Sequence, residues 1–168
     1  MKKSTDEKGT TAAIRRILIK AGAFAAAMWI LTSFVYGLKR ADGDSMAPSV
    51  CRGDICIFTR LESCSLEDVV VYRTETGIKI GRIVSIAGQT VDFCDGHMTI
   101  DGTVPVEMLP VKTYAAEKTE TAFPVTIGED EFFILNDDRR DTEDSRKSGP
   151  VKRRDIIGKV AYILKKGA

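Results

Sequence analysis

The sequence predicts an all-β domain that follows a single N-terminal transmembrane helix. An uncharged apolar run over 21–38 predicts the helix, and short β-branched stretches separated by turn signals predict the β domain. With 168 residues the chain has room for one domain with a core. Its composition, 43% apolar and 29% charged, differs from that of a disordered tail or of a protein with many membrane spans.

The apolar run is long enough to cross a membrane. A helix of this length spans about 27 Å, close to the ~30 Å hydrocarbon core of a bilayer. A cleaved secretory signal would have a shorter apolar region and a small-x-small site behind it, which residues 37–40 do not provide. A buried helix of a soluble fold is the other alternative, but this run is longer than a domain of this size usually hides. We therefore expect 21–38 to be an anchor in membrane lipid.

Charge predicts the orientation of this anchor. Residues 1–38 hold six Lys and Arg side chains and two acidic ones, although the whole chain sums to only +1. Because cations before the span outnumber those just after it, we expect 1–20 to be a basic leader in the cytoplasm. The β domain, 39–168, is then outside the cytoplasm, behind a single pass through the plasma membrane. A basic end on a nearly neutral chain indicates a membrane partner and no nucleic acid.

The remaining chain reads as short strands. Many short strands at regular spacing indicate a sandwich or a partly open barrel. Asp95-Gly96 between two of them is a strong signal for a tight hairpin. Three prolines within 104–126 indicate a long surface excursion. The predicted strands are 55–58, 69–72, 78–86, 90–93, 98–100, 132–135 and 158–164.

The cysteines and the single histidine predict no metal site. The spacings of Cys51, Cys56, Cys64 and Cys94 match neither CxxC nor a zinc signature, and they allow three pairings, none of which is predicted. Cys56 stands in an apolar run and is expected to be a buried thiol. His97 stands at the hairpin turn and is expected to be solvated. We expect no cofactor.

The first motif that carries chemistry is GDSMAPSV at 43–50. Ser45 stands between small residues and a proline-fixed turn, so its hydroxyl and the surrounding N–H groups are expected to be accessible. Attack on a carbonyl needs such a hydroxyl, and stabilising the resulting oxyanion needs such N–H groups. The alternative is an ordinary turn after a membrane helix.

The second motif is LNDDRRDTEDSR at 135–146, which alone reads as a solvated loop between two strands. Together, GxSMxPS and DDRxxTxDSRxxGxV resemble the type I signal peptidase family (peptidase family S26), membrane-anchored serine proteases of the Ser-Lys type. The family pattern is GxSMxP(S/T)L and GDNRxxSxDSRxxGxV. The resemblance covers nearly the whole chain and implies a signal-peptidase-like antiparallel β domain.

The resemblance implies roles for residues of both motifs. Ser45 stands at the nucleophile, and its N–H with a group at Gly43 would form the oxyanion hole. Met46 follows the nucleophile, and Pro48 shapes its turn. In the second motif, Thr142 stands where a hydroxyl orients the catalytic lysine, and Asp144 and Arg146 match a bracing pair with Ser145 between them. Exported preproteins would bind as an extended strand, with small residues at P1 and P3.

One departure concerns the general base. In the family, a lysine precedes an arginine in a strand reading KRVxGxPGDxV, but Gly81 precedes Arg82 here. Lys79 is a possible substitute, because two residues along a strand it faces the same side, displaced by about 6.6 Å. We expect Gly81 to leave space open for the Lys79 stem, provided that the strand is bent or bulged there. Lys79 reads equally as a solvated residue at a strand edge.

Other departures and candidates weigh less. The usual Gly-Asp-Asn is replaced by Asn136-Asp137-Asp138. Asp44 and His97 are weaker candidates for the base, the first because it points away from Ser45 and the second because it is remote.

Two functions therefore stay in view. The first is a signal peptidase that cleaves exported preproteins after small-x-small motifs, with an atypical base. The second is a catalytically impaired signal-peptidase-like scaffold or chaperone for surface-pilus assembly, with pilin subunits or the sortase machinery as partners. Ser45 and the intact Asp144-Ser145-Arg146 motif favour the enzyme, and Gly81 favours the scaffold.

Overall fold

The computed structural model describes residues 3–105, 112–117 and 121–167. The chain divides into two compact units, Met1–Tyr36 and Gly37–Ala168. The expected surface excursion, 104–126, lies partly outside the described residues, which omit 106–111 and 118–120.

The first unit is the helix α1 (Lys3–Val35), of which Ile14–Val35 is long and apolar enough to cross a membrane, with a mean hydropathy of 1.7. The helix ends three residues before the expected limit at Leu38, because the next residues form strand β1 (Tyr36–Arg40) and join the large sheet. A Cβ on Gly37 would lie 2.2 Å from the Phe58 ring, so this strand packs too closely for a side chain. The prediction was wrong at this boundary because an apolar run does not distinguish the end of a helix from an adjoining strand.

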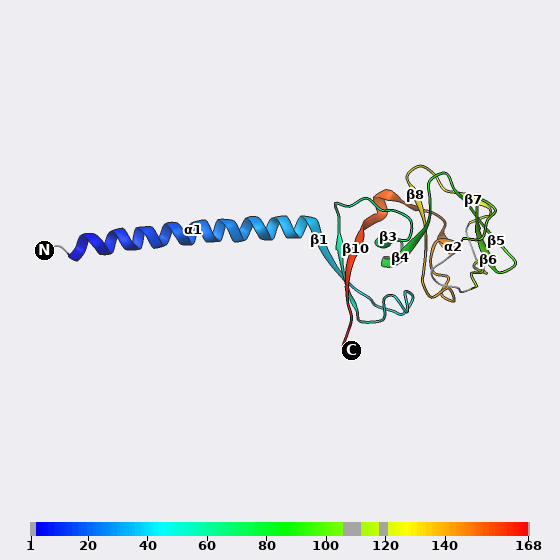
Figure 1. Ribbon diagram of the computed structural model, residues 1–168, viewed down its shortest axis with the longest axis horizontal. Helices are drawn as coiled ribbons and strands as arrows, with labels where there is room; N and C mark the ends of the chain where they lie inside the picture. Colours follow the sequence, from blue (N-terminus) through cyan, green and yellow to red (C-terminus); the bar gives the residue numbers. More distant parts are fainter. Residues whose placement is uncertain (1–2, 106–111, 118–120, 168) are drawn as a thin grey trace. The chain divides into compact units, whose positions relative to one another are not determined.

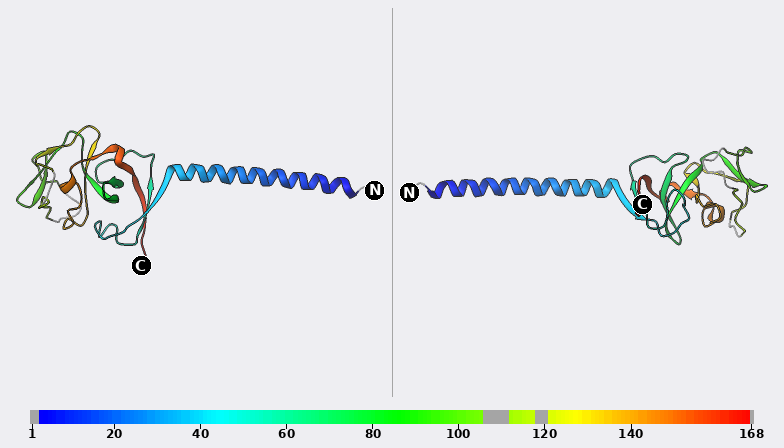
Figure 2. Two further views of the ribbon diagram at one scale, coloured as in Figure 1. Left: turned by 180° about the vertical axis from the view of Figure 1, so that it is seen from behind. Right: turned by 60° about the horizontal axis from the view of Figure 1, so that its bottom comes forward.

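The second unit is built from two sheets, shown in Figures 1 and 2. The larger has the order β1-β2-β10-β3-β4-β8-β9, and the smaller has the order β6-β5-β7. The strands of the larger sheet after β1 are β2 (Ile55–Thr59), β3 (Val69–Thr74), β4 (Gly77–Ile86), β8 (Glu131–Leu135), β9 (Val151–Lys152) and β10 (Ile156–Leu164). The smaller sheet has β5 (Thr90–Cys94), β6 (His97–Ile100) and β7 (Val125–Thr126).

The predicted antiparallel all-β architecture is confirmed. In the larger sheet the pairs β2–β10, β10–β3, β3–β4, β4–β8 and β8–β9 are antiparallel, and so are β5–β6 and β5–β7 in the smaller sheet. The hairpin at Asp95-Gly96 is confirmed as well, because both residues have positive φ, 51° and 77°. Strands β1, β7 and β9 and the short helices α2 (Ser145–Ser148) and η1 (Arg153–Asp155) were not predicted. Strands of two residues exist only through their pairing and leave no pattern of their own.

Three apolar clusters form the core. One lies beneath the Ser45 turn, one lies between the two sheets, and one lies around Tyr72 and Ile134. Their buried members are, in that order, Ala41, Met46, Val50, Cys56, Phe58, Val71 and Ile80; Val84, Val91, Met98, Ile127, Phe133 and Leu135; and Val70, Tyr72, Ile83, Phe132 and Ile134.

The four cysteines are free. Cys56 is fully buried, as expected, and burial raises the pKa of its thiol. Cys51 and Cys94 are exposed. His97 is exposed in the smaller sheet, which Figure 1 shows at the end of the domain away from β1 and β10.

Strand β4 contains Lys79, Gly81 and Arg82, so its pairing with the neighbouring strands determines where these residues lie. Its pairing with β3 is regular, with Tyr72 opposite Lys79 and Val70 opposite Gly81. Its pairing with β8 places Arg82 opposite Leu135 and is irregular only between Ile83 and Ser85. The bend or bulge near Gly81 that a substitution by Lys79 would need is therefore not seen in the pairing with β3, and the one irregularity in the pairing with β8 lies further along β4.

Close packing of β10 on β2 gives a test of the fold. A Cβ on Gly158 would lie 2.4 Å from the carbonyl oxygen of Thr59 and 2.7 Å from the Phe58 ring. Gly158→Ala should therefore lower the free energy of unfolding by about 1–3 kcal/mol, as overpacked sites do. Denaturant unfolding measures the change. Gly43→Ala is the control, because no atom lies within 4 Å of its added Cβ; equal effects of the two substitutions would contradict this packing.

Candidate active site

Ser45 lies in a tight turn that follows β1. The turn is closed by hydrogen bonds from the Ala47 N–H to the Asp44 carbonyl (2.9 Å) and from the Val50 N–H to the Met46 carbonyl (2.8 Å). Met46 anchors it, because its side chain is 2% exposed and packs in the cluster below. Ser45 itself is half-buried. The sequence folds this way because an apolar residue follows the serine and holds the backbone down.

A second loop holds the same turn from its other side. The Asp138 N–H donates to the Ser45 carbonyl (2.9 Å), and the Asp137 N–H donates to the Met46 sulfur (3.4 Å). The two sequence motifs therefore meet here through their main chains. Among the described residues, neither the Ser45 nor the Gly43 N–H donates a hydrogen bond, so both are available to an oxyanion.

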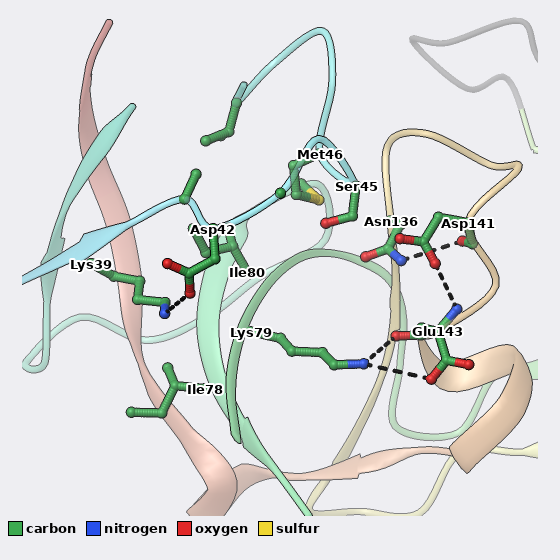
Figure 3. Close-up of a pocket in the computed structure, with 13 residues that line it drawn as sticks. Lys39, Asp42, Ser45, Met46, Ile78, Lys79, Ile80, Asn136, Asp141 and Glu143 are labelled. Carbon is green, nitrogen blue, oxygen red and sulfur yellow. Dashed lines mark hydrogen bonds and ion pairs between the residues drawn. The ribbon is translucent and has the colours of Figure 1, made fainter. Parts of the chain in front are cut away.

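Ser45 faces a pocket with a volume of about 160 Å³. Figure 3 shows Ser45 on one side of it and Lys79 on the other. The apolar floor comes from the cluster beneath the turn. The lining consists of Lys39, Ala41, Asp42, Gly43, Ser45, Met46, Val50, Ile78, Lys79, Ile80, Asn136, Asp141 and Glu143.

The Lys79 amine is held away from Ser45, as Figure 3 shows. Its Nζ donates to the carbonyl of Glu143 (2.8 Å) and lies 4.0 Å from the carboxylate of the same residue. Glu143 also pairs with Lys147, and that hydrogen bond, together with the charges of Lys147 and Lys79, lowers the pKa of the Glu143 carboxyl. Lys79 thus shares the pocket with Ser45 while its amine binds the opposite wall.

The space at Gly81 is filled, contrary to the expectation from sequence. A Cβ at this position would lie 2.5 Å from Cγ2 of Ile134 and 3.1 Å from Cε1 of Tyr72. Ile134 is fully buried and Tyr72 is 1% exposed, so neither has free room to move. Sequence reasoning did not anticipate this because the filling side chains come from two other strands.

Tyr72 leaves one polar group unsatisfied. Its hydroxyl is buried without a hydrogen-bond partner among the described residues. Burial and the charges of Asp144 and Asp141 raise the pKa of this phenol well above its usual value, so it stays neutral.

Within the loop at 135–146, Asp144 and Arg146 form a buried ion pair. Both side chains are 0% exposed, and the guanidinium binds the carboxylate through two hydrogen bonds, Nε to Oδ1 (2.9 Å) and Nη2 to Oδ2 (2.6 Å). The other guanidinium hydrogen bonds go to the carbonyls of Arg139 (2.7 Å), Asp141 (2.6 Å) and Tyr114 (3.3 Å). Ser145 completes the brace, because its Oγ accepts from the Ile134 N–H (3.0 Å).

A second ion pair, which sequence reasoning missed, joins β4 to this loop. Arg82 donates through Nε and Nη2 to the two carboxylate oxygens of Asp137 (2.8 and 2.7 Å). Nη2 also contacts Ser49 Oγ (3.2 Å), in the turn that carries Ser45. The signal that could have found this pair is Arg82 itself, which stands at the arginine of the family's KRVxGxPGDxV pattern.

The remaining residues that the sequence singled out do not line the Ser45 pocket. Thr142 is half-buried, and within the described ranges its hydroxyl makes no hydrogen bond. Pro48 is exposed in the turn. The Asp44 carboxylate binds the Arg52 N–H (2.8 Å) and does not line the pocket, and His97 lies in the smaller sheet.

Comparisons with known proteins cover nearly the whole chain. A family model described as signal peptidase, peptidase S26, matches residues 14–165. The inactive signal peptidase IA of Staphylococcus aureus (strain COL) is 25% identical over 143 residues, 80% of this chain and 81% of that protein. Signal peptidase I of Bacillus amyloliquefaciens is 24% identical over 147 residues, 80% of this chain and 79% of that protein.

Two further matches cover less. The probable thylakoidal processing peptidase 2 of Arabidopsis thaliana is 27% identical over 138 residues, 74% of this chain and 36% of that protein. The solved structure of a signal peptidase I from Enterococcus faecalis V583 aligns with a TM-score of 0.49 at 21% identity, over 60% of this chain and 98% of that one.

Filling of the Gly81 site can be measured. Gly81→Ala should lower the free energy of unfolding by about 1–3 kcal/mol, because the new methyl group overlaps Cγ2 of Ile134. Ile134→Leu removes that branch at nearly constant volume, so the double variant should recover much of the loss. Denaturant unfolding of the two single variants and the double variant measures the coupling. Additive losses would show that Ile134 is not the obstacle.

Loss of the buried ion pair should be far more damaging. Asp144→Asn leaves the Arg146 guanidinium buried without a counter-charge, so we expect a loss of about 3–5 kcal/mol in the free energy of unfolding. Asp138→Asn is the matched control: its partner Arg140 is 87% exposed, and such pairs contribute about 0–1 kcal/mol. Similar losses in both variants, measured by denaturant unfolding, would contradict a bracing role for Asp144.

Proposed function

Because the chain belongs to the signal peptidase family, peptidase S26, we propose that it is a membrane-anchored serine endopeptidase that removes signal peptides from exported preproteins. The observation that carries this proposal is a pocket that both Ser45 and Lys79 line. Cleavage would follow small-x-small motifs, because a pocket of about 160 Å³ with Ala41, Met46 and Ile80 in its lining suits small apolar side chains.

The proposed reaction uses Ser45 as the nucleophile and Lys79 as the base. Nζ of Lys79 takes the proton as Oγ of Ser45 attacks the carbonyl, and the N–H of Ser45 with a group at Gly43 binds the oxyanion. The proton then passes to the leaving amine, and water hydrolyses the ester on Ser45. This requires Lys79 to leave the Glu143 carbonyl when the extended substrate enters.

The location that we propose follows from α1. Its apolar segment anchors the chain in the plasma membrane as a single pass, and the positive leader keeps the N-terminus in the cytoplasm. The β domain then meets preproteins on the outer side, where signal peptides are removed.

A second function is favoured by specific observations. Gly81 carries no base, its site is filled, and the Lys79 amine is bound to Glu143. One relative is also named an inactive signal peptidase. In this second proposal the chain is a scaffold or chaperone that binds extended polypeptides, such as pilin subunits or partners in the sortase machinery, without cleaving them.

Cleavage of a preprotein by the full chain in detergent tests the first function. Ser45→Ala and Lys79→Ala should each lower the rate by at least ~10²-fold, since general-base catalysis typically contributes ~10²–10⁴-fold. Lys39→Ala is the matched control, because this lysine lines the same pocket but pairs with Asp42 (2.5 Å), and it should retain most of the rate.

Two outcomes separate the functions. Absence of turnover by the unsubstituted chain, or equal cleavage by Ser45→Ala, would reject the protease. The scaffold predicts that surface-pilus polymer persists with Ser45→Ala and is lost on deletion of the gene; unchanged polymer after deletion would reject it.

A further inference from the structure

Two departures from the family pattern lie opposite each other in space. Arg82 on β4 pairs with Leu135 on β8, so the next residues along the two antiparallel segments are Gly81 and Asn136. The family has lysine and glycine at these two places. This chain therefore lacks a side chain at 81 and carries an additional one at 136, at the border of the Ser45 pocket.

Hydrogen bonds fix the orientation of the Asn136 amide. Its Nδ2 donates to the Asp141 carbonyl (3.3 Å), and its backbone N–H donates to the Asp144 carboxylate (3.0 Å). Because the nitrogen is engaged there, Oδ1 is the atom on the pocket side, and an amide oxygen only accepts. Figure 3 shows this oxygen on the side where Ser45 lies.

The charged side chains around the pocket already have partners. Asp42 pairs with Lys39, and the Glu143 carboxylate pairs with Lys147. The Asp141 carboxylate accepts from the Glu143 N–H (3.0 Å), and the Lys79 amine binds the Glu143 carbonyl.

Two neutral groups are left. Within the described part of the chain, neither Oγ of Ser45 nor Oδ1 of Asn136 has a hydrogen-bond partner. The pocket thus offers a hydroxyl and a neutral acceptor, which suits an uncharged polar ligand.

An extended polypeptide presents the complementary pair. The N–H and C=O of one residue in a strand point to the same side, as in the hydrogen-bonded pairs of an antiparallel sheet. We propose that Asn136 Oδ1 accepts the N–H of the substrate residue whose carbonyl faces Ser45, that is, the residue before the cleavage site. This inference rests on the proposed binding of small-x-small polypeptides, and it holds whether or not the bond is cleaved.

An amide-to-ester exchange in the ligand tests this contact. The probe is a fluorescent peptide with alanine at both small positions, compared with an analogue in which an ester oxygen replaces the N–H of the residue before the cleavage site. Binding is measured by fluorescence anisotropy with the full chain in detergent, carrying Ser45→Ala to prevent turnover. The amide should bind about 2- to 12-fold more tightly than the ester, the range for one hydrogen bond.

Variants assign the effect to Asn136. In Asn136→Gly, which restores the family residue, the amide and the ester should bind equally. Asp138→Asn is the control, since it restores the family residue in the same loop without altering the pocket lining, and it should keep the full discrimination. Moving the ester one residue toward the N-terminus places it on the opposite edge of the strand and should leave binding unchanged.

The failures are distinguishable. The role of Asn136 would be overturned, with the proposed function left standing, by either of two results. One is an equal preference for the amide over the ester in Asn136→Gly and in the chain that keeps Asn136. The other is equal binding of amide and ester by the chain that keeps Asn136. If Asn136→Gly fails to fold, the shifted ester decides, because loss of affinity at both ester positions would also overturn it. No binding of the all-amide peptide to any variant would reject the proposed function itself and, with it, this contact.

Discussion

The site depends on one buried ion pair. The Arg146 guanidinium is fully buried, and besides Asp144 it binds the carbonyls of Arg139 and Asp141, so one side chain fixes a polar loop that has little apolar content of its own. Asp144 in turn accepts the N–H of Asn136, at the exit of β8. Such a pair is expensive to desolvate, and its hydrogen bonds to those carbonyls of the loop hold that loop in one defined conformation. That conformation presents the Asp138 N–H to the Ser45 carbonyl, and this hydrogen bond is one of the contacts that position the turn carrying Ser45.

Most of the architecture could be predicted from the sequence because the strands are short, β-branched and bounded by turn residues. The 95–96 hairpin is the clearest case, since Asp-Gly supplies the two positive φ angles that a tight turn requires. The edge strands β1, β7 and β9 could not be predicted in this way. Their strand character comes from partners distant in the chain, and for β1 the apolar composition continues directly from the helix.

The residues of the site could be predicted from the sequence, but the contacts between them could not. The motifs identify Ser45 and the Asp144-Ser145-Arg146 segment, and strand periodicity places Lys79 on the same face as Gly81. Sequence could not show that Ile134 and Tyr72 fill the space over Gly81, because packing between strands depends on a register set by three of them. Nor could it show that the Glu143 carbonyl takes the Lys79 amine, since a main-chain acceptor leaves no mark in the residue pattern.

Retention of a serine without the family's lysine is physically consistent with two uses of the same groove. Binding an extended strand requires donors and acceptors in fixed positions. The Arg82–Asp137 and Asp144–Arg146 pairs hold the loop rigid, and neither pair involves the lysine that proton transfer would need. Proton transfer requires more, namely an amine that is both near Ser45 and free of competing partners. Lys79 lines the same pocket as Ser45, but its amine is bound to the Glu143 carbonyl on the opposite wall, so in this structure it meets neither condition. In the mechanism that we propose, the release of the Lys79 amine from the Glu143 carbonyl is therefore the step that separates an enzyme from a binding scaffold, and the entering polypeptide strand would have to compete for that contact.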